Sequence, residues 1–193
     1  KGAASATPPG LPEDDRAAAI YMDVATTKKN AAAAAEIVAG VAGKIKGGAI
    51  LADWAAFDRD ERERLRKFRH ALPETVNSII AERRREHPKL TKLGTDMAVP
   101  DEHLRGIFDV YRRMLDAKSL EYVIFGHIGN NHVHVNILPR SPEEYDEGKK
   151  IYAEFAREVL RMGGSISAEH GIGRLKKNFL AMAAICKKVP AKP

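Results

Sequence analysis

Three of the chain's seven histidines lie close together in the stretch "FGHIGNNHVHVNILPR", residues 125–140. His132 and His134 alternate with valines, which is typical of side chains on one face of a strand. His127 precedes them across a short polar segment. Imidazoles bind transition metals and exchange protons near neutral pH, so this grouping indicates a metal or acid–base site. The alternative is that the histidines are polar residues with a structural role only.

A hairpin turn would decide how these histidines face one another. Asparagine tolerates positive φ, so Asn130 and Asn131 predict a two-residue turn between strands at 121–128 and 132–138. In that register His127 lies directly opposite His134, and two opposed imidazoles on one face can share one metal ion. The valines between the histidines then pack on helices, and the polar face is either the open face of the sheet or faces something absent from this chain.

A third ligand is available in "SAEHGIG", where Glu169 and His170 end a predicted strand at a Gly-rich turn. Two imidazoles and one carboxylate suit Zn²⁺ first, and Mn²⁺ or Fe²⁺ after it. His170 would stand beside the metal as a candidate general base, with its side chain diverging from that of Glu169.

The elements that must position these residues follow the order β-α-β-β-α-β over residues 95–170. Asp101 is predicted to cap the first helix, and Ser141 with Glu144 forms a capping box for the second. This order predicts an α+β fold, a ferredoxin-like antiparallel sheet with helices packed on one face. The four strands are expected at 95–100, 121–128, 132–138 and 165–170.

Further elements are predicted on either side. Alternating apolar residues indicate a strand at 17–25, followed by an Ala-rich helix ending at Gly47 and a second strand near residues 49–54. Residues 58–87 are predicted to be helical but interrupted at Pro73. The polar, Pro-rich residues 1–16 indicate a linker. The segment 171–188 begins a last helix, and the domain is expected to end at residue 180, with residues 181–193 as a C-terminal tail.

The composition narrows the class of protein. The 193 residues include one cysteine, Cys186, which excludes an internal disulfide and a Cys-based zinc site and suits a reducing compartment. The net charge is +6, but basic residues are dispersed among acidic ones, so we expect solvated helix surfaces and no nucleic-acid partner. No run of residues reaches the length of a membrane span. We expect a cytoplasmic protein, or one peripheral to the membrane.

Four segments together resemble the C-terminal domain of the FAD-linked oxidases, a family that includes D-lactate dehydrogenases, the glycolate oxidase flavoprotein subunit and D-2-hydroxyglutarate dehydrogenase. They are "RHALPE", "TDMAVPDEHL", "GHIGNNHVHVNILP" and "GGSISAEHGIGRLKK". The resemblance implies that residues 17–180 form the substrate-binding domain of a two-domain flavoenzyme. The N-terminal FAD-binding domain is absent from this chain, which starts at Lys1 and is expected to be a piece of something longer.

The resemblance also implies roles for individual residues. It places the metal ligands at His127, His134 and Glu169 and the catalytic base at His170. Two departures from the family pattern stand out: "GNNH" replaces the usual "GDGN", and Gly94 stands where many relatives have a lysine. Substrate contacts are carried over to Arg69, Asn136 and Lys92, the lysine nearest to that position.

The activity that the resemblance implies is oxidation of a D-2-hydroxy acid to the 2-oxo acid, with hydride transfer to FAD. The expected partners are the 2-hydroxy acid substrate, the N-terminal FAD domain and an electron-acceptor protein or a quinone. We expect the isolated chain to be inactive, because it lacks the flavin that accepts the hydride.

Two other functions fit parts of the sequence. "HVHVNILP" is similar to the signature of histidine-triad nucleotide hydrolases, although Asn136 stands in place of the third histidine. That function does not explain the "EHGIG" segment. A non-catalytic ferredoxin-like binding module is the other alternative.

Overall fold

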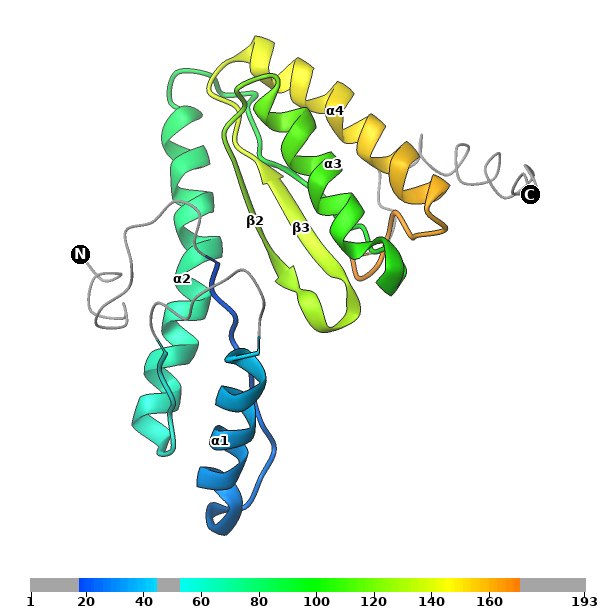
Figure 1. Ribbon diagram of the computed structural model, residues 1–193. Helices are drawn as coiled ribbons and strands as arrows, with labels where there is room; N and C mark the ends of the chain where they lie inside the picture. Colours follow the sequence, from blue (N-terminus) through cyan, green and yellow to red (C-terminus); the bar gives the residue numbers. More distant parts are fainter. Residues whose placement is uncertain (1–17, 45–52, 171–193) are drawn as a thin grey trace, which may run out of the picture. The chain divides into compact units, whose positions relative to one another are not determined.

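A computed structural model of the chain describes residues 18–44 and 53–170. The chain divides into two compact units, Lys1–Thr75 and Val76–Pro193. The predicted linker, the C-terminal helix and tail, and most of the strand expected near 49–54 lie outside the described residues. Figure 1 shows the helices and strands along the chain.

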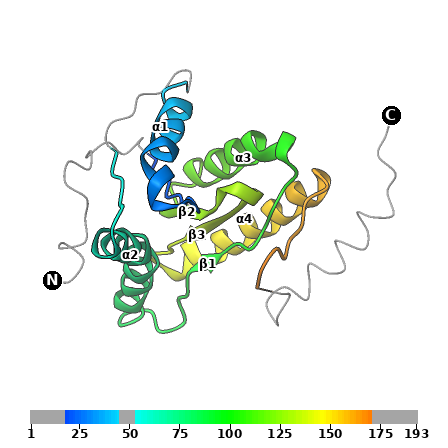
Figure 2. The same cartoon turned by 90° about the horizontal axis from the view of Figure 1, so that it is seen from below.

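The second unit is built on an antiparallel sheet. Its strands are β1 (Leu93–Gly94), β2 (Tyr122–His127) and β3 (His132–Ile137), arranged in the order β1-β3-β2. The helices α3 (Leu104–Asp116) and α4 (Pro142–Arg161) lie side by side over one face of this sheet (Figures 1 and 2). The predicted α+β class is confirmed.

The core of this unit lies between the sheet and these two helices. Val135 and Ile137 point into it from β3 and are fully buried. Tyr111 of α3 and Phe155 of α4 meet edge to face, with ring centroids 4.6 Å apart. The expectation that the valines of the histidine strand pack on helices is confirmed for Val135. The other buried residues of the core cluster are Met97, Val99, Ile107, Val110, Leu115, Leu120, Ile151, Ala156, Val159 and Ile166.

The opposite face of the sheet has its own, smaller apolar cluster. Val76 and Ile80, from the end of α2 (Arg59–Arg83), are buried there with Leu138. Val123 and Phe125 of β2 pack against them. The helix pair therefore covers one face, as expected, and a helical segment also covers part of the face that carries the histidines.

The outer strands are shorter than expected. Of the segment 95–100, Ala98 alone forms isolated antiparallel bridges, to His132 and to Ser165. The ladder is interrupted because the Thr95 hydroxyl, and not a backbone carbonyl, accepts the hydrogen bond from the Val135 N–H at 2.9 Å. Segment 165–170 contributes only its bridge, so the four-stranded ferredoxin-like arrangement stays a prediction.

The predicted N-cap of α4 at Ser141 is confirmed, but the Glu144 carboxylate bonds to the residue before the cap and not to the N-cap N–H of a full capping box. The Ser141 hydroxyl accepts a hydrogen bond from the Glu144 N–H at 3.2 Å, and the Glu144 carboxylate accepts one from the Arg140 N–H at 2.8 Å. The predicted cap at Asp101 is wrong. Asp101 begins a 3-10 turn, Asp101–His103, and its carboxylate accepts a hydrogen bond from the Asn131 side chain instead.

In the first unit, the helix α1 (Ala31–Ala42), preceded by a 3-10 turn (Lys28–Asn30), lies within the predicted Ala-rich helix. The strand expected at 17–25 is wrong over its described residues, 18–25, which pair with no other described strand. The alternating residues Ile20, Met22 and Val24 remain 52–65% exposed, so their pattern buries no face.

The interruption expected at Pro73 is also wrong, because α2 runs through this residue without a break. Proline removes one hydrogen-bond donor, which a long helix can lose without ending. The Thr75 hydroxyl donates a hydrogen bond to the Ala71 carbonyl at 2.8 Å in the same turn. Within the described residues, no helix is long and apolar enough to cross a membrane.

Candidate active site

The histidine hairpin has a different register from the predicted one. His127 pairs with His132, and Phe125, not His127, pairs with His134. The connection is four residues long because a 3-10 turn, Ile128–Asn130, is followed by Asn131 in the left-handed conformation at φ 55°. A shift of two residues keeps every side chain on the same face. The histidines therefore still share one face of the sheet.

Glycine at position 126 permits this close pairing of β2 and β3. A Cβ atom there would lie 2.5 Å from the carbonyl oxygen of His132, closer than any real contact. The sequence predicted that the polar face of the sheet is open or faces something absent from this chain, but two of its side chains are buried. His132 is 3% exposed and Asn136 is 4% exposed. The open end of this face is at His127, whose side chain is 47% exposed.

A buried carboxylate holds the loop that carries the two predicted residues of the EHG motif. Asp96, 2% exposed, accepts hydrogen bonds from the backbone N–H groups of Glu169 and His170, both at 3.0 Å. The Ala168 N–H donates to the Asp96 carbonyl, also at 3.0 Å. Asp96 thus fixes the backbone of Glu169 and His170 next to β3.

Four imidazoles meet at one oxygen atom of Glu169. Glu169 Oε2 lies 3.7 Å from His127 Nε2, 3.6 Å from His132 Nδ1 and 3.9 Å from His134 Nε2. His170 Nε2 also lies 3.9 Å from this oxygen. The prediction that the Glu169 and His170 side chains diverge is therefore wrong. The loop is tight enough that both side chains turn toward the histidines of the hairpin.

The predicted metal ligands come together. His127, His134 and Glu169 each offer a ligand atom, and these atoms lie within 4.8 Å of one another. His134 Nδ1 lies 2.7 Å from the Thr95 carbonyl oxygen, which can only accept a hydrogen bond, so this nitrogen carries the proton. Its Nε2 then presents a lone pair toward Glu169. At metal sites, the ring nitrogen of a histidine ligand that does not bind the ion usually donates to a carbonyl or carboxylate in this way.

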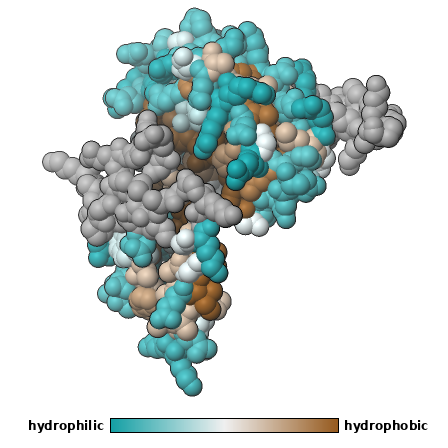
Figure 3. Space-filling view, in the orientation of Figure 1, coloured by the Kyte–Doolittle hydropathy of each residue, from teal (hydrophilic) through white to brown (hydrophobic). Residues whose placement is uncertain are grey.

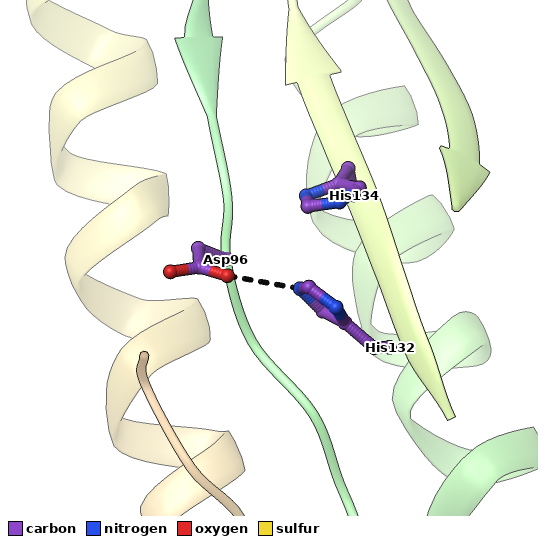
Figure 4. Close-up of side chains that lie close together, drawn as sticks. All are labelled: Asp96, His132 and His134. Atoms are coloured by element: carbon purple, nitrogen blue, oxygen red, sulfur yellow. Dashed lines mark ion pairs between the residues drawn. The ribbon is translucent and has the colours of Figure 1, made fainter. Parts of the chain in front are cut away.

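His132 has a buried carboxylate behind its ring. Its Nε2 lies 2.9 Å from Asp96 Oδ1, at ion-pair distance but without good hydrogen-bond alignment (Figure 4). Burial lowers the pKa of His132, and repulsion from His134 adds to this. Asp96 and Glu169 act in the opposite direction but more weakly. Burial thus favours the neutral ring, which is the form that can bind a metal.

A small hollow opens beside these groups. Its volume is about 220 Å³, and its lining comes from both the hairpin and the 168–169 loop. Such a space admits a small molecule next to the exposed His127 and Glu169 side chains. The lining residues are His127, Asn130, His132, Ala168 and Glu169.

The predicted substrate contacts lie in different places. Asn136 is two residues beyond His134 on the same face, and its buried Nδ2 has no hydrogen-bond partner among the described residues. Lys92 is partly buried, and its ammonium donates to Asn77 Oδ1 at 2.9 Å. Arg69 belongs to the first unit, where its guanidinium lies 5.7 Å from the centre of the Tyr21 ring.

Sequence reasoning missed the role of Asp96. The available signal was an acidic residue directly before the apolar run "MAVP" of a predicted strand. A carboxylate buried at such a position requires strong hydrogen-bonding or charged partners. The burial of His132 was missed too, because alternation gives the face on which a side chain lies and not what covers it.

A family match decides the class of this chain. The family described as "FAD linked oxidases, C-terminal domain" matches residues 3–188. The chain belongs to this family. The resemblance found in the sequence motifs is thereby confirmed, and the match spans both the histidine hairpin and the EHG motif.

Individual relatives match only part of this chain. A mitochondrial D-lactate dehydrogenase [cytochrome] of Arabidopsis thaliana is 32% identical over 88 residues, which is 45% of this chain and 16% of the relative. The glycolate oxidase subunit GlcD of Bacillus subtilis is 25% identical over 58% of this chain and 24% of its own. A D-2-hydroxyglutarate dehydrogenase of Xanthomonas citri is 41% identical over 32% of this chain and 14% of its own. These matches span less than a quarter of each relative's length.

Proposed function

We propose that this chain is the substrate- and metal-binding domain of an FAD-dependent dehydrogenase or oxidase that converts a D-2-hydroxy acid to the 2-oxo acid. The observation that carries the proposal is the convergence of His127, His134 and Glu169 in a member of the FAD-linked oxidase family. The names of its relatives, which include D-lactate and D-2-hydroxyglutarate dehydrogenases, support the substrate class. The same match favours this function over a histidine-triad hydrolase.

The donor set fits a divalent metal ion, with Zn²⁺ the first choice. Two imidazoles and a carboxylate oxygen are the ligands of many catalytic zinc sites, which keep one further position for water or substrate. His134 has its ring fixed by the Thr95 carbonyl, and Glu169 has its backbone fixed by Asp96. When bound, the ion would act as a Lewis acid that lowers the pKa of a substrate hydroxyl.

His170 is proposed to take the hydroxyl proton of the substrate. Its side chain is 65% exposed and its ring lies 5.6 Å from that of His134, centroid to centroid. The ring therefore stands at the rim of the ligand group, where an incoming substrate can reach it. FAD, held by the domain that lies outside this chain, would accept the hydride from the substrate carbon.

The remaining polar groups suit the substrate's carboxylate. The Asn136 amide is a buried donor with no described partner, and an unsatisfied buried donor gains about 1–3 kcal/mol when it is paired. We propose that Asn136 binds substrate, with Lys92 and Arg69 as further cationic contacts. Release of Lys92 from Asn77 would be required for such a contact.

The electron acceptor and the location of the enzyme stay predictions. An acceptor protein or a quinone would reoxidise the flavin. The names of several relatives, including the Arabidopsis protein and a yeast D-lactate dehydrogenase, place those proteins in mitochondria. A cytoplasmic or membrane-peripheral location is our expectation for this protein.

Elemental analysis of the full-length protein that carries this chain tests the proposal. We expect about one divalent ion per chain and turnover of a D-2-hydroxy acid such as lactate, glycolate or 2-hydroxyglutarate. His134→Ala should lose both the ion and turnover. His87→Ala is the matched control, because His87 belongs to neither group of candidate ligands. Full metal content in the His134→Ala protein would contradict the assignment.

A further inference from the structure

His132 stands outside the roles assigned so far, although it is the most buried of the clustered histidines. Its side chain is 3% exposed, and its ring lies 4.3 Å from that of His134, centroid to centroid. A buried imidazole has a stability cost unless both ring nitrogens find partners. The question is therefore what each nitrogen of His132 faces.

One nitrogen faces a fixed carboxylate. His132 Nε2 lies 2.9 Å from Asp96 Oδ1, the ion pair drawn in Figure 4, and a small turn of the ring would align it for a hydrogen bond. Asp96 is held by the backbone N–H groups of Glu169 and His170. Because this carboxylate cannot swing away, it favours a proton on Nε2 and leaves the lone pair on Nδ1.

The other nitrogen faces the metal ligands. His132 Nδ1 lies 3.6 Å from Glu169 Oε2, slightly closer than His127 Nε2 at 3.7 Å and His134 Nε2 at 3.9 Å. Zn–N and Zn–O bonds of about 2.0–2.2 Å place neighbouring ligands of a tetrahedral zinc about 3.3 Å apart. Each of the three imidazole nitrogens is therefore within a few tenths of an ångström of ligand spacing from this one oxygen. His132 is not part of the group of ligand atoms within 4.8 Å that His127, His134 and Glu169 form, so binding of all four requires these side chains to draw together.

We propose that His132 is a further ligand of this metal site, bound through Nδ1, so that three imidazoles and Glu169 hold the ion. The inference rests on the proposed function only in requiring that the site binds a metal. Asp96 is then a positioning residue that orients the His132 ring, in the carboxylate–histidine–metal arrangement.

Two other assignments are less well supported by the geometry. Asp96, His132 and His134 form a second compact group of ligand atoms within 4.8 Å. The oxygens of Asp96 are already engaged by the 169–170 backbone, however, so we assign it to the ring and not to an ion. His170 is as close to Glu169 as His134 is, but it is mostly exposed, and none of the described residues accepts a hydrogen bond from its ring.

X-ray absorption at the zinc edge of the full-length, Zn²⁺-loaded protein tests the proposal by counting imidazoles. We expect three in the wild type, two in His132→Asn and three in His170→Ala. Chelator competition should show Zn²⁺ affinity falling more than about 100-fold in His132→Asn. In Asp96→Asn it should fall about 10- to 100-fold, the usual effect of losing the partner that orients a metal-binding histidine. His87→Ala should leave both readouts unchanged.

The outcomes separate this proposal from the proposed function. Two imidazoles in the wild type, or three in His132→Asn, would overturn the role of His132 and leave the His127, His134 and Glu169 site standing. Failure of the wild type to bind Zn²⁺ would overturn both. If His132→Asn does not fold, the wild-type count together with that of His170→Ala still decides the question.

Discussion

Glu169 is the residue at which the site converges, since one of its oxygens lies within 3.9 Å of a nitrogen from each of four imidazoles. The neighbouring His170 differs from the other three in its exposure, at 65% of its side chain. Glu169, at 50% exposed, has its carboxylate among the hairpin nitrogens, where a ligand must be, whereas a base must reach the substrate. We therefore separate the two roles at this pair.

In the full-length enzyme, His170→Ala should lower kcat about 10²- to 10⁴-fold, the usual contribution of a general base. Metal content should stay unchanged. Glu169→Gln should lose metal first and activity with it. Steady-state kinetics and elemental analysis of the same preparations check both expectations. A His170→Ala protein without metal, beside a Glu169→Gln protein that retains it, would show that the two roles are exchanged.

At the scale of elements, the site depends on how the loop after α4 is attached to the segment after β1. Ser165 forms a bridge with Ala98, and the Asp96 side chain accepts hydrogen bonds from the backbone N–H groups of residues 169 and 170. Hydrogen bonds to a charged group contribute about 1.5–3 kcal/mol each. The loop is therefore held mainly by one buried carboxylate.

Asp96→Asn should loosen this loop, because an amide can accept one of the two N–H groups but presents its own donor to the other. Backbone amides of the peptide covering 165–170 should exchange hydrogen about 10- to 100-fold faster, which corresponds to the loss of one charge-assisted bond. Hydrogen-exchange mass spectrometry of the full-length protein measures this. Ser167→Ala is the control. It removes only one described contact, the long one between the Ser167 hydroxyl and Asp96 Oδ2, at 3.4 Å, and should leave the exchange nearly unchanged. Unchanged exchange in Asp96→Asn would contradict the anchoring role.

The start of α4 should make stability depend on pH. The hydrogen bond from the Arg140 guanidinium, at 2.9 Å, holds the pKa of Glu144 below its ordinary value, and the Arg140 N–H adds to this against the effect of burial. A carboxyl with a lowered folded pKa stabilises the fold above the unfolded pKa, about 4.3 for glutamate. That contribution is lost as pH falls through the folded pKa.

Glu144→Gln should therefore lower the melting temperature of the chain near pH 7, and the difference from wild type should shrink below about pH 4. Thermal unfolding followed by circular dichroism at several pH values checks this. Glu154→Gln removes a carboxylate from an exposed pair with Arg157 on the same helix and should have little effect. A difference between Glu144→Gln and wild type that persists at pH 3 would argue against the ionic cause.

At the scale of the whole molecule, the two units differ in how much they bury. The buried core residues all lie in Val76–Pro193, whereas none of the described residues of Lys1–Thr75 is buried. Apolar residues reach the surface over α1 (Figure 3), where Ile37 and Val41 are 68% and 63% exposed. Burial of apolar surface is the main stabilising contribution to folding, so the second unit should be the stable one.

Hydrogen exchange of the isolated chain without FAD should show this difference directly. Amides of α3, β3 and α4 should be protected, and those of α1 should exchange at nearly the rate of an unfolded helix-forming peptide. A chain in which α1 is as protected as α4 would contradict the expectation.

The sequence by itself determined the parts of this protein that depend on neighbouring residues. Alternation put His132, His134 and Asn136 on one face, and the "SPEE" segment marked the start of α4. The family motifs identified the metal candidates and the class of the protein. These features survive because a strand has a period of two, so even a hairpin register wrong by two residues leaves each face intact.

Tertiary structure alone decided which of these residues touch. The opposition of His127 to His132, the burial of His132 and the pairing of His132 with Asp96 depend on a four-residue connection and on contacts between distant segments. The same is true of Glu169, which reaches the hairpin because a buried carboxylate holds its backbone. Such contacts depend on burial and on the geometry of hydrogen bonds across the fold, and a periodic pattern along the chain carries no information about either.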